Sequence, residues 1–109
     1  MKVLLDESVP KVLGFELHDH FVRTAQTVGW SGFSNGRLLA EMARQGFEVL
    51  VTCDQNIEYQ QNPALPVALI VLVATDNRVP TILRLAPSLR KTLESIRAGD
   101  IFRNRKIRP

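Results

Sequence analysis

The sequence predicts an α/β fold built on a mostly parallel sheet of four to five strands, with helices covering both faces. Short apolar runs that suit strands alternate with segments whose apolar residues recur at helical spacing. The run VALIVLVA (67–74) is apolar at every position, which is typical of a strand buried on both faces of a parallel sheet. Right-handed crossovers then bring the carboxyl ends of the strands to one edge of the sheet, where such folds bind ligands.

Four segments are expected to form the strands of this sheet. They are residues 2–6, 21–25, 47–53 and 67–74. The basic tail, residues 101–109, suits either a flexible end or an added edge strand.

The first two helices are predicted from their boundaries. Ser8 as N-cap and Pro10 in a first turn indicate a helix that ends at HDH, residues 18–20. A glycine-containing loop then leads to a second helix over about residues 36–45, with Gly46 as its stop.

The second half of the chain adds one more helical region. The segment QNIEYQQNP (55–63) is a polar loop or one short helical turn. Pro80 begins a helical region that Pro87 breaks or restarts, and its apolar positions continue until Gly99. Residues 1–100 are therefore expected to form one domain.

Composition excludes several classes of protein. The chain has 109 residues, 45% of them hydrophobic, which suits one globular domain. A single cysteine excludes a disulfide framework and is typical of a reducing cytosol. Strand-like sequence begins within two residues of the start, which leaves no room for a signal peptide, and no apolar run is long enough to span a bilayer. We therefore expect a soluble, cytoplasmic protein without membrane contact.

The charge is unevenly distributed along the chain. Up to Asn77 there are five bases against nine acids, and from Arg78 onward nine bases against two acids. A basic segment joined to an acidic site suits a polyanionic substrate that is held by its phosphates. The alternative is a solvated helix face followed by a basic tail.

Two predicted core strands run directly into an aspartate. Asp6 follows Val-Leu-Leu, and Asp54 follows Val-Leu-Val-Thr-Cys. If their strands are neighbours, the two carboxylates face each other at one sheet edge and repel unless a cation lies between them. Carboxylate and amide oxygens select hard cations such as Mg²⁺ or Mn²⁺. The alternative is that each aspartate caps the segment that follows it, and this is the interpretation we favour for Asp76.

Four motifs together resemble a known family. They are LLDESVP (4–10), GWSGFSNGRLL (29–39), VLVTCDQN (49–56) and YQQN (59–62). They resemble the small single-domain PIN-like proteins, which are relatives of VapC-like toxins. Within this group they are most similar to the branch known as domain-of-unknown-function family 5615. The resemblance covers roughly residues 2–78.

This resemblance implies a three-layer α/β/α sandwich and Mg²⁺- or Mn²⁺-dependent cleavage of RNA. It also implies a toxin of a toxin–antitoxin pair, held by a small antitoxin protein, and a homodimer is left open. Asp6 and Asp54 match the family's metal-binding, catalytic acids. Asn35 and Asn56 stand where relatives commonly have acids, and because an amide brings no charge, the affinity for a metal should be lower. Glu7 lies beside the expected site.

Further residues are candidates for compensation or for substrate contact. Glu41 or Glu58 could replace the missing charge. Arg78, just past the fourth strand, is the best candidate for a phosphate contact, with Arg84, Arg103, Arg105 and Lys106 behind it. Nucleotide contacts are expected from the polar cluster of Asn56, Tyr59, Gln60, Gln61 and Asn62. The alternatives are solvated charges for the bases and a polar turn for the cluster.

Four other residues are interpreted structurally. Trp30 is expected to close the glycine loop as a hydrophobic plug, with base stacking as the alternative. His18 and His20 are expected in a turn and not in a metal triplet, because adjacent residues of a strand point to opposite faces. Cys53 is expected in the core.

Two other functions compete with the nuclease. A PIN-like module that has lost catalysis would only bind RNA or a protein partner, and Asn35 and Asn56 favour it. A receiver-type phosphoacceptor domain would use Asp6 and Glu7 for Mg²⁺, Asp54 as the phosphorylated residue and Thr75 as the switch hydroxyl. Its weakness is that no clear fifth strand supplies a lysine, since Lys106 lies in the tail.

Overall fold

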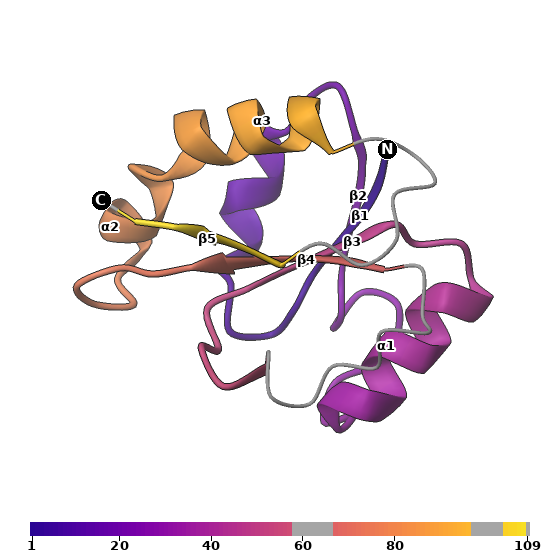
Figure 1. Cartoon of the computed structure of the whole chain (residues 1–109). Helices are drawn as coiled ribbons and strands as arrows, with labels where there is room; N and C mark the ends of the chain where they lie inside the picture. Colours follow the sequence, from indigo (N-terminus) through magenta and orange to yellow (C-terminus); the bar gives the residue numbers. More distant parts are fainter. Residues whose placement is uncertain (58–66, 97–103, 109) are drawn as a thin grey trace.

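The computed structural model describes residues 1–57, 67–96 and 104–108. Within them, five strands form one parallel sheet in the order β2-β1-β3-β4-β5 (Figure 1). The strands are β1 (Lys2–Leu5), β2 (Phe21–Thr24), β3 (Val49–Thr52), β4 (Ala68–Leu72) and β5 (Asn104–Ile107). The predicted α/β class with a parallel sheet is thus confirmed.

The order of the strands reverses direction beside β1. The chain passes from β1 to β2 on one side and then returns to place β3 on the other side of β1. In open parallel sheets, the crevice at such a reversal is the usual ligand site. The registers Leu5↔Val51 and Thr52↔Val71 align the carboxyl ends of β1, β3 and β4 at one edge.

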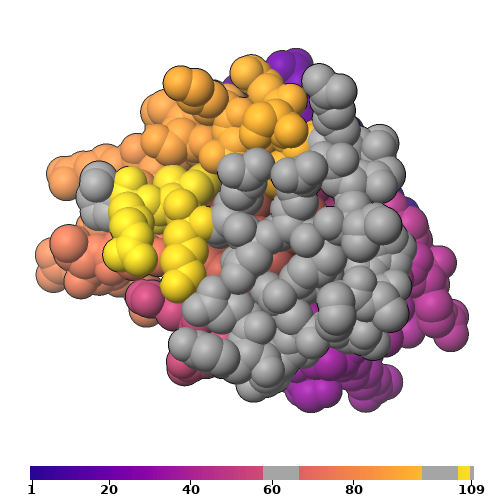
Figure 2. Space-filling view, in the orientation of Figure 1, coloured from indigo at the N-terminus to yellow at the C-terminus, as the bar shows by residue number. Residues whose placement is uncertain are grey.

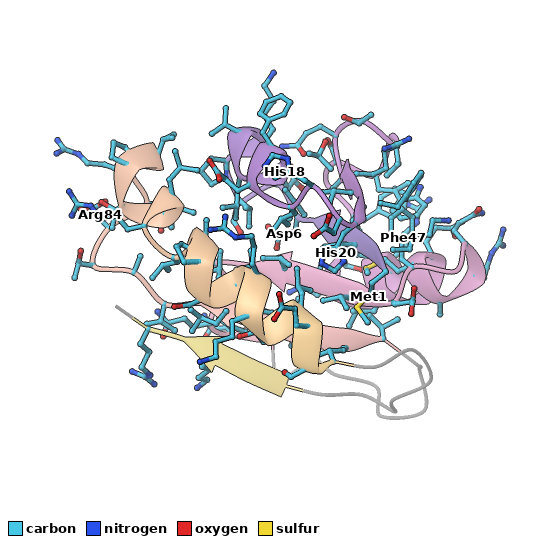
Figure 3. All side chains as sticks on the ribbon, turned by 90° about the horizontal axis from the view of Figure 1, so that it is seen from above. Met1, Asp6, His18, His20, Phe47 and Arg84 are labelled. Carbon is cyan, nitrogen blue, oxygen red and sulfur yellow. The ribbon has the colours of Figure 1, made fainter. Side chains whose placement is uncertain are left out.

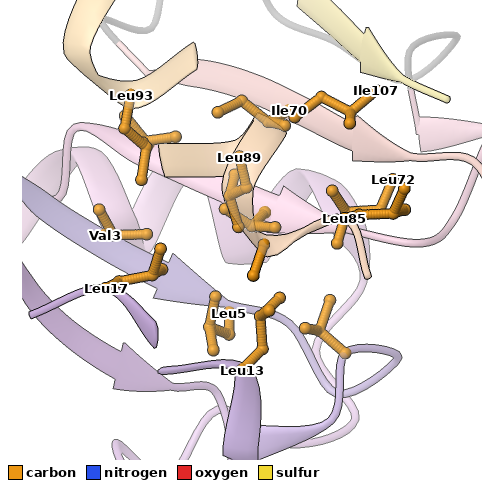
Figure 4. Packing of buried hydrophobic residues seen from close by; sticks show 14 of the residues in the cluster. Val3, Leu5, Leu13, Leu17, Ile70, Leu72, Leu85, Leu89, Leu93 and Ile107 are labelled. Atoms are coloured by element: carbon orange, nitrogen blue, oxygen red, sulfur yellow. The ribbon is translucent and has the colours of Figure 1, made fainter. Parts of the chain in front are cut away.

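Alternating side chains of the strands build one hydrophobic core on each face of the sheet. Val3 and Leu5 point to one face, where they join residues of η1 (Lys11–Glu16), α2 (Val79–Leu83) and α3 (Ala86–Ser95) (Figure 4). Leu4 points to the other face, which α1 (Asn35–Arg44) covers. All residues of β3 and β4 are buried, as the apolar runs predicted.

The first helical segment differs from the expectation. Lys11–Glu16 is a 3₁₀ helix, and Pro10 stands at its N-cap without a side-chain hydrogen bond. The prediction that Ser8 caps a helix is wrong, because the Ser8 hydroxyl donates to the Asp6 carboxylate instead. A short segment without a capping side chain keeps the tighter 3₁₀ geometry.

The other helix boundaries agree with the sequence. Ser34 caps α1, with its hydroxyl oxygen accepting from the Arg37 amide at 3.3 Å. Gly46 follows α1 with a φ of 79°, a conformation that favours glycine and stops the helix. Pro80 and Pro87 stand at the first turns of α2 and α3, so the predicted restart is confirmed.

The basic tail contributes the strand β5 at the sheet edge beyond β4. The Val73 amide donates to the Ile107 carbonyl at 2.8 Å, and the Ile107 side chain is buried in the core beneath α3. In the space-filling view, β5 lies at the surface next to α3 (Figure 2). Among the residues described, no helix has the length and apolar character needed to cross a bilayer.

Candidate functional site

The candidate site lies at the carboxyl ends of β1 and β3. Asp6 directly follows β1, and its amide donates to the Val51 carbonyl of β3 at 3.0 Å. Its side chain is only 7% exposed (Asp6 in Figure 3). Such burial of a carboxylate requires hydrogen-bond donors around it.

Three donors surround the Asp6 carboxylate. Its Oδ1 accepts from the Ser8 amide at 2.7 Å and from the Ser8 hydroxyl at 2.5 Å. Its Oδ2 accepts from the hydroxyl of Thr52, the last residue of β3. A carboxylate offers about four acceptor positions, so about one remains, on Oδ2. Asp6 is therefore held in one orientation and retains capacity for one further ligand.

The Thr52 hydroxyl connects the two aspartates of the site. The same oxygen that donates to Asp6 accepts from the Asp54 amide at 3.0 Å. Thr52 is fully buried, so this link is shielded from water. The Asp6 carboxylate and the Asp54 backbone amide are thus each one hydrogen bond away from the same hydroxyl at this edge of the sheet.

Asp54 is held more loosely than Asp6. Its side chain is half-buried, and its Oδ1 accepts from the Asn56 amide at 2.9 Å. Its Oδ2 accepts from Nδ2 of Asn35, the first residue of α1, over a long 3.4 Å. The structure therefore brings Asp6, Asp54 and Asn35 together and places the Asn56 backbone beside them. Asn35 presents its donor group to Asp54, so a metal would be bound by its oxygen only after the amide turns over.

Cys53 lies between Thr52 and Asp54 and packs against the core. Burial raises the pKa of the Cys53 thiol, the negative charge of Asp6 raises it further, and a hydrogen bond with Ser8 acts in the opposite direction. The thiol therefore stays protonated near neutral pH, which does not suit a nucleophile. The Cys53 amide donates to the Ser8 hydroxyl oxygen at 3.0 Å and so fixes this hydroxyl against Asp6.

Glu7 contacts the glycine loop that precedes α1. Its Oε1 accepts from the Gly32 amide at 2.8 Å, which ties the loop before α1 to the end of β1. In this arrangement Oε1 of Glu7 stabilises the glycine loop. Trp30 of the same loop packs against Phe33 and Phe47, as expected of a hydrophobic plug.

Asp76 at the end of β4 has a separate role. Its Oδ1 accepts from the Arg78 amide at 2.9 Å at the beginning of α2. This hydrogen bond, a second one with Thr81 and the charge of Arg84 hold the pKa of the Asp76 carboxyl below its ordinary value. Asp76 therefore caps the segment that follows it, and Arg78 is exposed at the same edge of the sheet.

Several predicted residues lie elsewhere or outside the described part of the chain. Glu41 contacts Arg44 and Gln45 in the last turn of α1, away from Asn35. His18 lies in the turn before β2, as expected, and His20 directly precedes that strand. The candidates outside the described residues are Glu58, Tyr59, Gln60, Gln61, Asn62 and Arg103, and the side chain of Arg105 is likewise not described.

Sequence reasoning missed two residues of the site, Ser8 and Thr52. A signal for Ser8 exists, because a serine two residues after an aspartate often returns a hydrogen bond to it. Thr52 gives no such signal, since its partner Asp6 is 46 residues away.

The donor set fits a hard divalent cation only in part. No group of three or more His, Cys, Asp or Glu side chains that could hold a metal occurs among residues 1–57, 67–96 and 104–108. Two carboxylates and one amide remain, and Mg²⁺ binds through one or two carboxylates while keeping several waters.

Comparisons with family models, with curated proteins and with solved structures found no match to this chain. The argument for function therefore depends on the geometry of the site and on the motifs of the sequence.

Proposed function

We propose that this protein is a metal-dependent ribonuclease of PIN-like type, with a three-layer α/β/α sandwich as its fold. The observation that carries the proposal is the shared Thr52 hydroxyl, which joins Asp6 and Asp54 at the reversal point of the sheet. Asp6 and Asp54 would bind Mg²⁺ or Mn²⁺, and Asn35 would add a neutral ligand. The ion would supply positive charge to a phosphodiester and polarise an attacking water.

The two aspartates have different parts in this proposal. Asp6 has three donors and little exposure, so it serves as the fixed anchor of the ion. Asp54 is half-buried, and one of its two partners is at 3.4 Å, so it can adjust as substrate binds. A fixed ligand beside an adjustable one suits a site that must also admit a phosphate.

A groove next to the site offers room for a polynucleotide. It has a volume of about 660 Å³ and runs beside the carboxyl ends of β1 and β2, where Ser8, Lys11, Gln26 and Thr27 line it. Arg78 is exposed and directly precedes Val79, which also lines this groove. A strand of RNA in this groove would contact Lys11 in its wall and would pass close to Arg78.

The test combines cleavage with an independent readout of metal binding. Wild type should cleave single-stranded RNA in Mn²⁺, and Asp54→Asn should abolish the cleavage. Mn²⁺ should broaden the NMR signals of residues 6–8, 35 and 52–54 in wild type, and Asp54→Asn should suppress this broadening. Asp76→Asn is the matched control, because it removes a carboxylate at the same edge that only caps α2. Equal cleavage by wild type and Asp54→Asn would contradict the proposed nuclease site.

A module that binds without catalysis is the second candidate. It is favoured by the Asn35 amide, which donates to Asp54 where an acid would add negative charge. If this candidate is correct, wild type binds RNA without cutting it, and Asn35→Asp strengthens the Mn²⁺ broadening because it restores the missing charge. The control Asn77→Asp adds an equal charge at an exposed position beyond β4 and should leave the broadening unchanged.

One feature of the structure supports the alternative of a receiver-type domain. The strand order is the flavodoxin-like order shared by response-regulator receivers, and β5 contains Lys106. This remains an argument from fold analogy. Incubation with acetyl phosphate decides it, because only a receiver forms an acid-stable, base-labile phosphate on Asp54. The toxin role and the antitoxin partner depend on the sequence resemblance and stay predictions.

A further inference from the structure

The outer edge of β2 is a candidate binding surface, with a function separate from that of the two aspartates. Among the described strands, β2 pairs with β1 alone. The amides of Phe21 and Ala25 donate to the Met1 and Leu5 carbonyls, at 3.0 and 2.9 Å. Because alternate residues of a parallel strand face one neighbour, the amides of Val22 and Thr24 point outward.

The outward carbonyls of this edge already have partners within the chain. The Val22 carbonyl accepts from Nη1 of Arg23 at 2.9 Å, and the Thr24 carbonyl accepts from the Val28 amide at 3.2 Å. Arg23 is exposed, so another strand could compete with it for this carbonyl. Among the described residues neither outward amide has a partner, so an incoming strand would find two donors, and one acceptor once Arg23 gives way.

Grooves flank β2 on both faces of the sheet. One groove, of about 640 Å³, lies between η1 and β2, and Phe15 and Val22 contribute to its wall. The other, of about 390 Å³, is lined by Val28, Trp30 and Phe47. Phe15 is 74% exposed and Phe21 48%, and among the described residues only Val79 is a further large hydrophobic residue so exposed. Alternate side chains of an added strand would enter these two grooves.

The charge of the grooves indicates the kind of partner. Lys11, His18, His20 and Arg23 line the larger groove, and Lys2 and Arg23 line the smaller one (His18, His20 and Phe47 in Figure 3). None of the described residues that line either groove is acidic. A second copy of this edge would bring like charges together, whereas an acidic segment would be attracted.

The aromatic rings of this region do not suit base stacking. The Arg23 guanidinium lies over the Phe21 ring at 4.0 Å, and Lys2 Nζ lies over Phe47 at 4.5 Å. Phe47 is itself buried. Since these ring faces are covered by the chain's own cations, a nucleic acid strand would find phosphate contacts but, of Phe15, Phe21 and Phe47, only Phe15 for stacking.

We propose that the outer edge of β2 binds an extended acidic segment of a partner protein, which adds to the sheet as a sixth strand. Backbone hydrogen bonds to Val22 and Thr24 would give affinity. Apolar side chains in the two grooves, together with acidic side chains near Lys2 and Arg23, would give specificity.

The test uses the intact protein and a defined peptide probe. The probe is an acetylated and amidated hexapeptide that alternates glutamate with isoleucine, and its control carries lysine in place of glutamate. The acidic probe should shift the NMR signals of Val22 and Thr24 saturably, and the lysine peptide should bind at least about tenfold more weakly. Equal binding by both peptides, no binding at millimolar probe, or shifts confined to other residues would overturn the proposal.

Two variants test the backbone pairing itself. Thr24→Pro removes an outward N–H and should therefore abolish binding. The variant should still fold, because proline is tolerated where an edge amide faces solvent. Thr24→Val loses the same hydroxyl but keeps the N–H and should bind the probe. If Thr24→Pro does not fold, probes N-methylated on alternate amides replace it, and only one of the two isomers should bind. Displacement of the probe by single-stranded RNA, or dimerisation through β2 in sedimentation, would contradict the proposed partner.

Discussion

The hydroxyl of Thr52 links the Asp6 carboxylate to the backbone amide of Asp54. It is buried, donates to Asp6 and accepts from the Asp54 amide. A threonine in this place can do both because a hydroxyl is donor and acceptor at once, whereas the valine that fits the same space is neither.

Thr52→Val should therefore destabilise the fold. The change leaves the Asp6 carboxylate and the Asp54 amide each without one partner, and we expect a loss of about 1–3 kcal/mol in the free energy of unfolding. Urea denaturation measures it. The control is Thr92→Val in α3, where the hydroxyl donates to the Ser88 carbonyl in a half-exposed position and the loss should stay within about 0.5 kcal/mol. Equal losses for the two variants would contradict the proposed role of Thr52.

The Asp76 carboxyl should titrate below the ordinary range. The Arg78 amide contributes most to the lowered pKa, then the Thr81 hydroxyl, and the Arg84 charge least. Because the folded state favours the ionised form, this contribution to stability is present above the unfolded pKa and is lost as the pH falls through the folded pKa. Carboxyl ¹³C NMR titration should show a larger rise of the Asp76 pKa in Thr81→Val than in Arg84→Gln. The reverse order would contradict this account.

For single residues, the sequence predicts the positions of the two aspartates but not their hydrogen-bond partners. Asp6 and Asp54 each follow an apolar run, and the parallel topology brings such positions to one edge. The bond from Thr52 to Asp6 depends on the register Leu5↔Val51, which no spacing in the sequence specifies. The bond from Ser8 to Asp6 is local, but a serine at this position is compatible with a helix cap as well, so the sequence predicts a cap.

The helix α1 positions Asn35 beside Asp54, and its ends are set by local chemistry. Ser34 caps its beginning, and Gly46 closes its end with a φ of 79°. The Phe47 amide donates to the Met42 carbonyl at 2.9 Å across this turn. Such boundaries are predictable because they involve only neighbouring residues.

Gly36 in the first turn of α1 and Gly46 just after its end should respond oppositely to the same change. Gly46→Ala should destabilise the fold by about 1–2 kcal/mol, because a Cβ is strained at this positive φ. Gly36→Ala should stabilise it by about 0.5–1 kcal/mol, because Gly36 is helical and its added Cβ meets nothing within 4 Å. Thermal unfolding measures both. Similar effects of the two substitutions would show that backbone conformation is not the deciding factor.

The first helical segment shows where local signals fail. Apolar residues 9, 12, 13 and 17 fit an α-helix, yet η1 is a 3₁₀ helix. In the structure Leu13 and Leu17 are fully buried and Val9 nearly so, so the apolar positions were interpreted correctly. The connection between β1 and β2 is short, and its one capping candidate is engaged by Asp6, which the periodicity alone does not reveal.

For the whole molecule, the open question from the sequence was the basic tail. It provides β5, which pairs with β4 and buries Ile107 in the core beneath α3. The sequence does not distinguish a free tail from a strand, because polar residues such as those of the tail occur both in flexible ends and in edge strands. The exposed Lys106 and Arg108 beside the buried Ile107 are the alternation that an edge strand produces.

Ile107→Ala should destabilise the fold by about 2–5 kcal/mol, because it opens a cavity in a packed core. The neighbouring Arg108→Ala is the control, and its exposed side chain should contribute less than about 0.5 kcal/mol. Guanidinium denaturation compares the two. If the effect of Ile107→Ala were as small as that of Arg108→Ala, β5 would not belong to the stable sheet in solution.

The all-parallel sheet has a consequence for how fast the chain folds. Paired residues such as Lys2 and Phe21, or Val3 and Val49, are far apart in the sequence, and no two of the described strands form a hairpin. Contact order is therefore high, and chains of this kind fold over milliseconds to seconds, not microseconds. During that interval the apolar strands are exposed to other nascent chains, so refolding yield should fall as protein concentration rises.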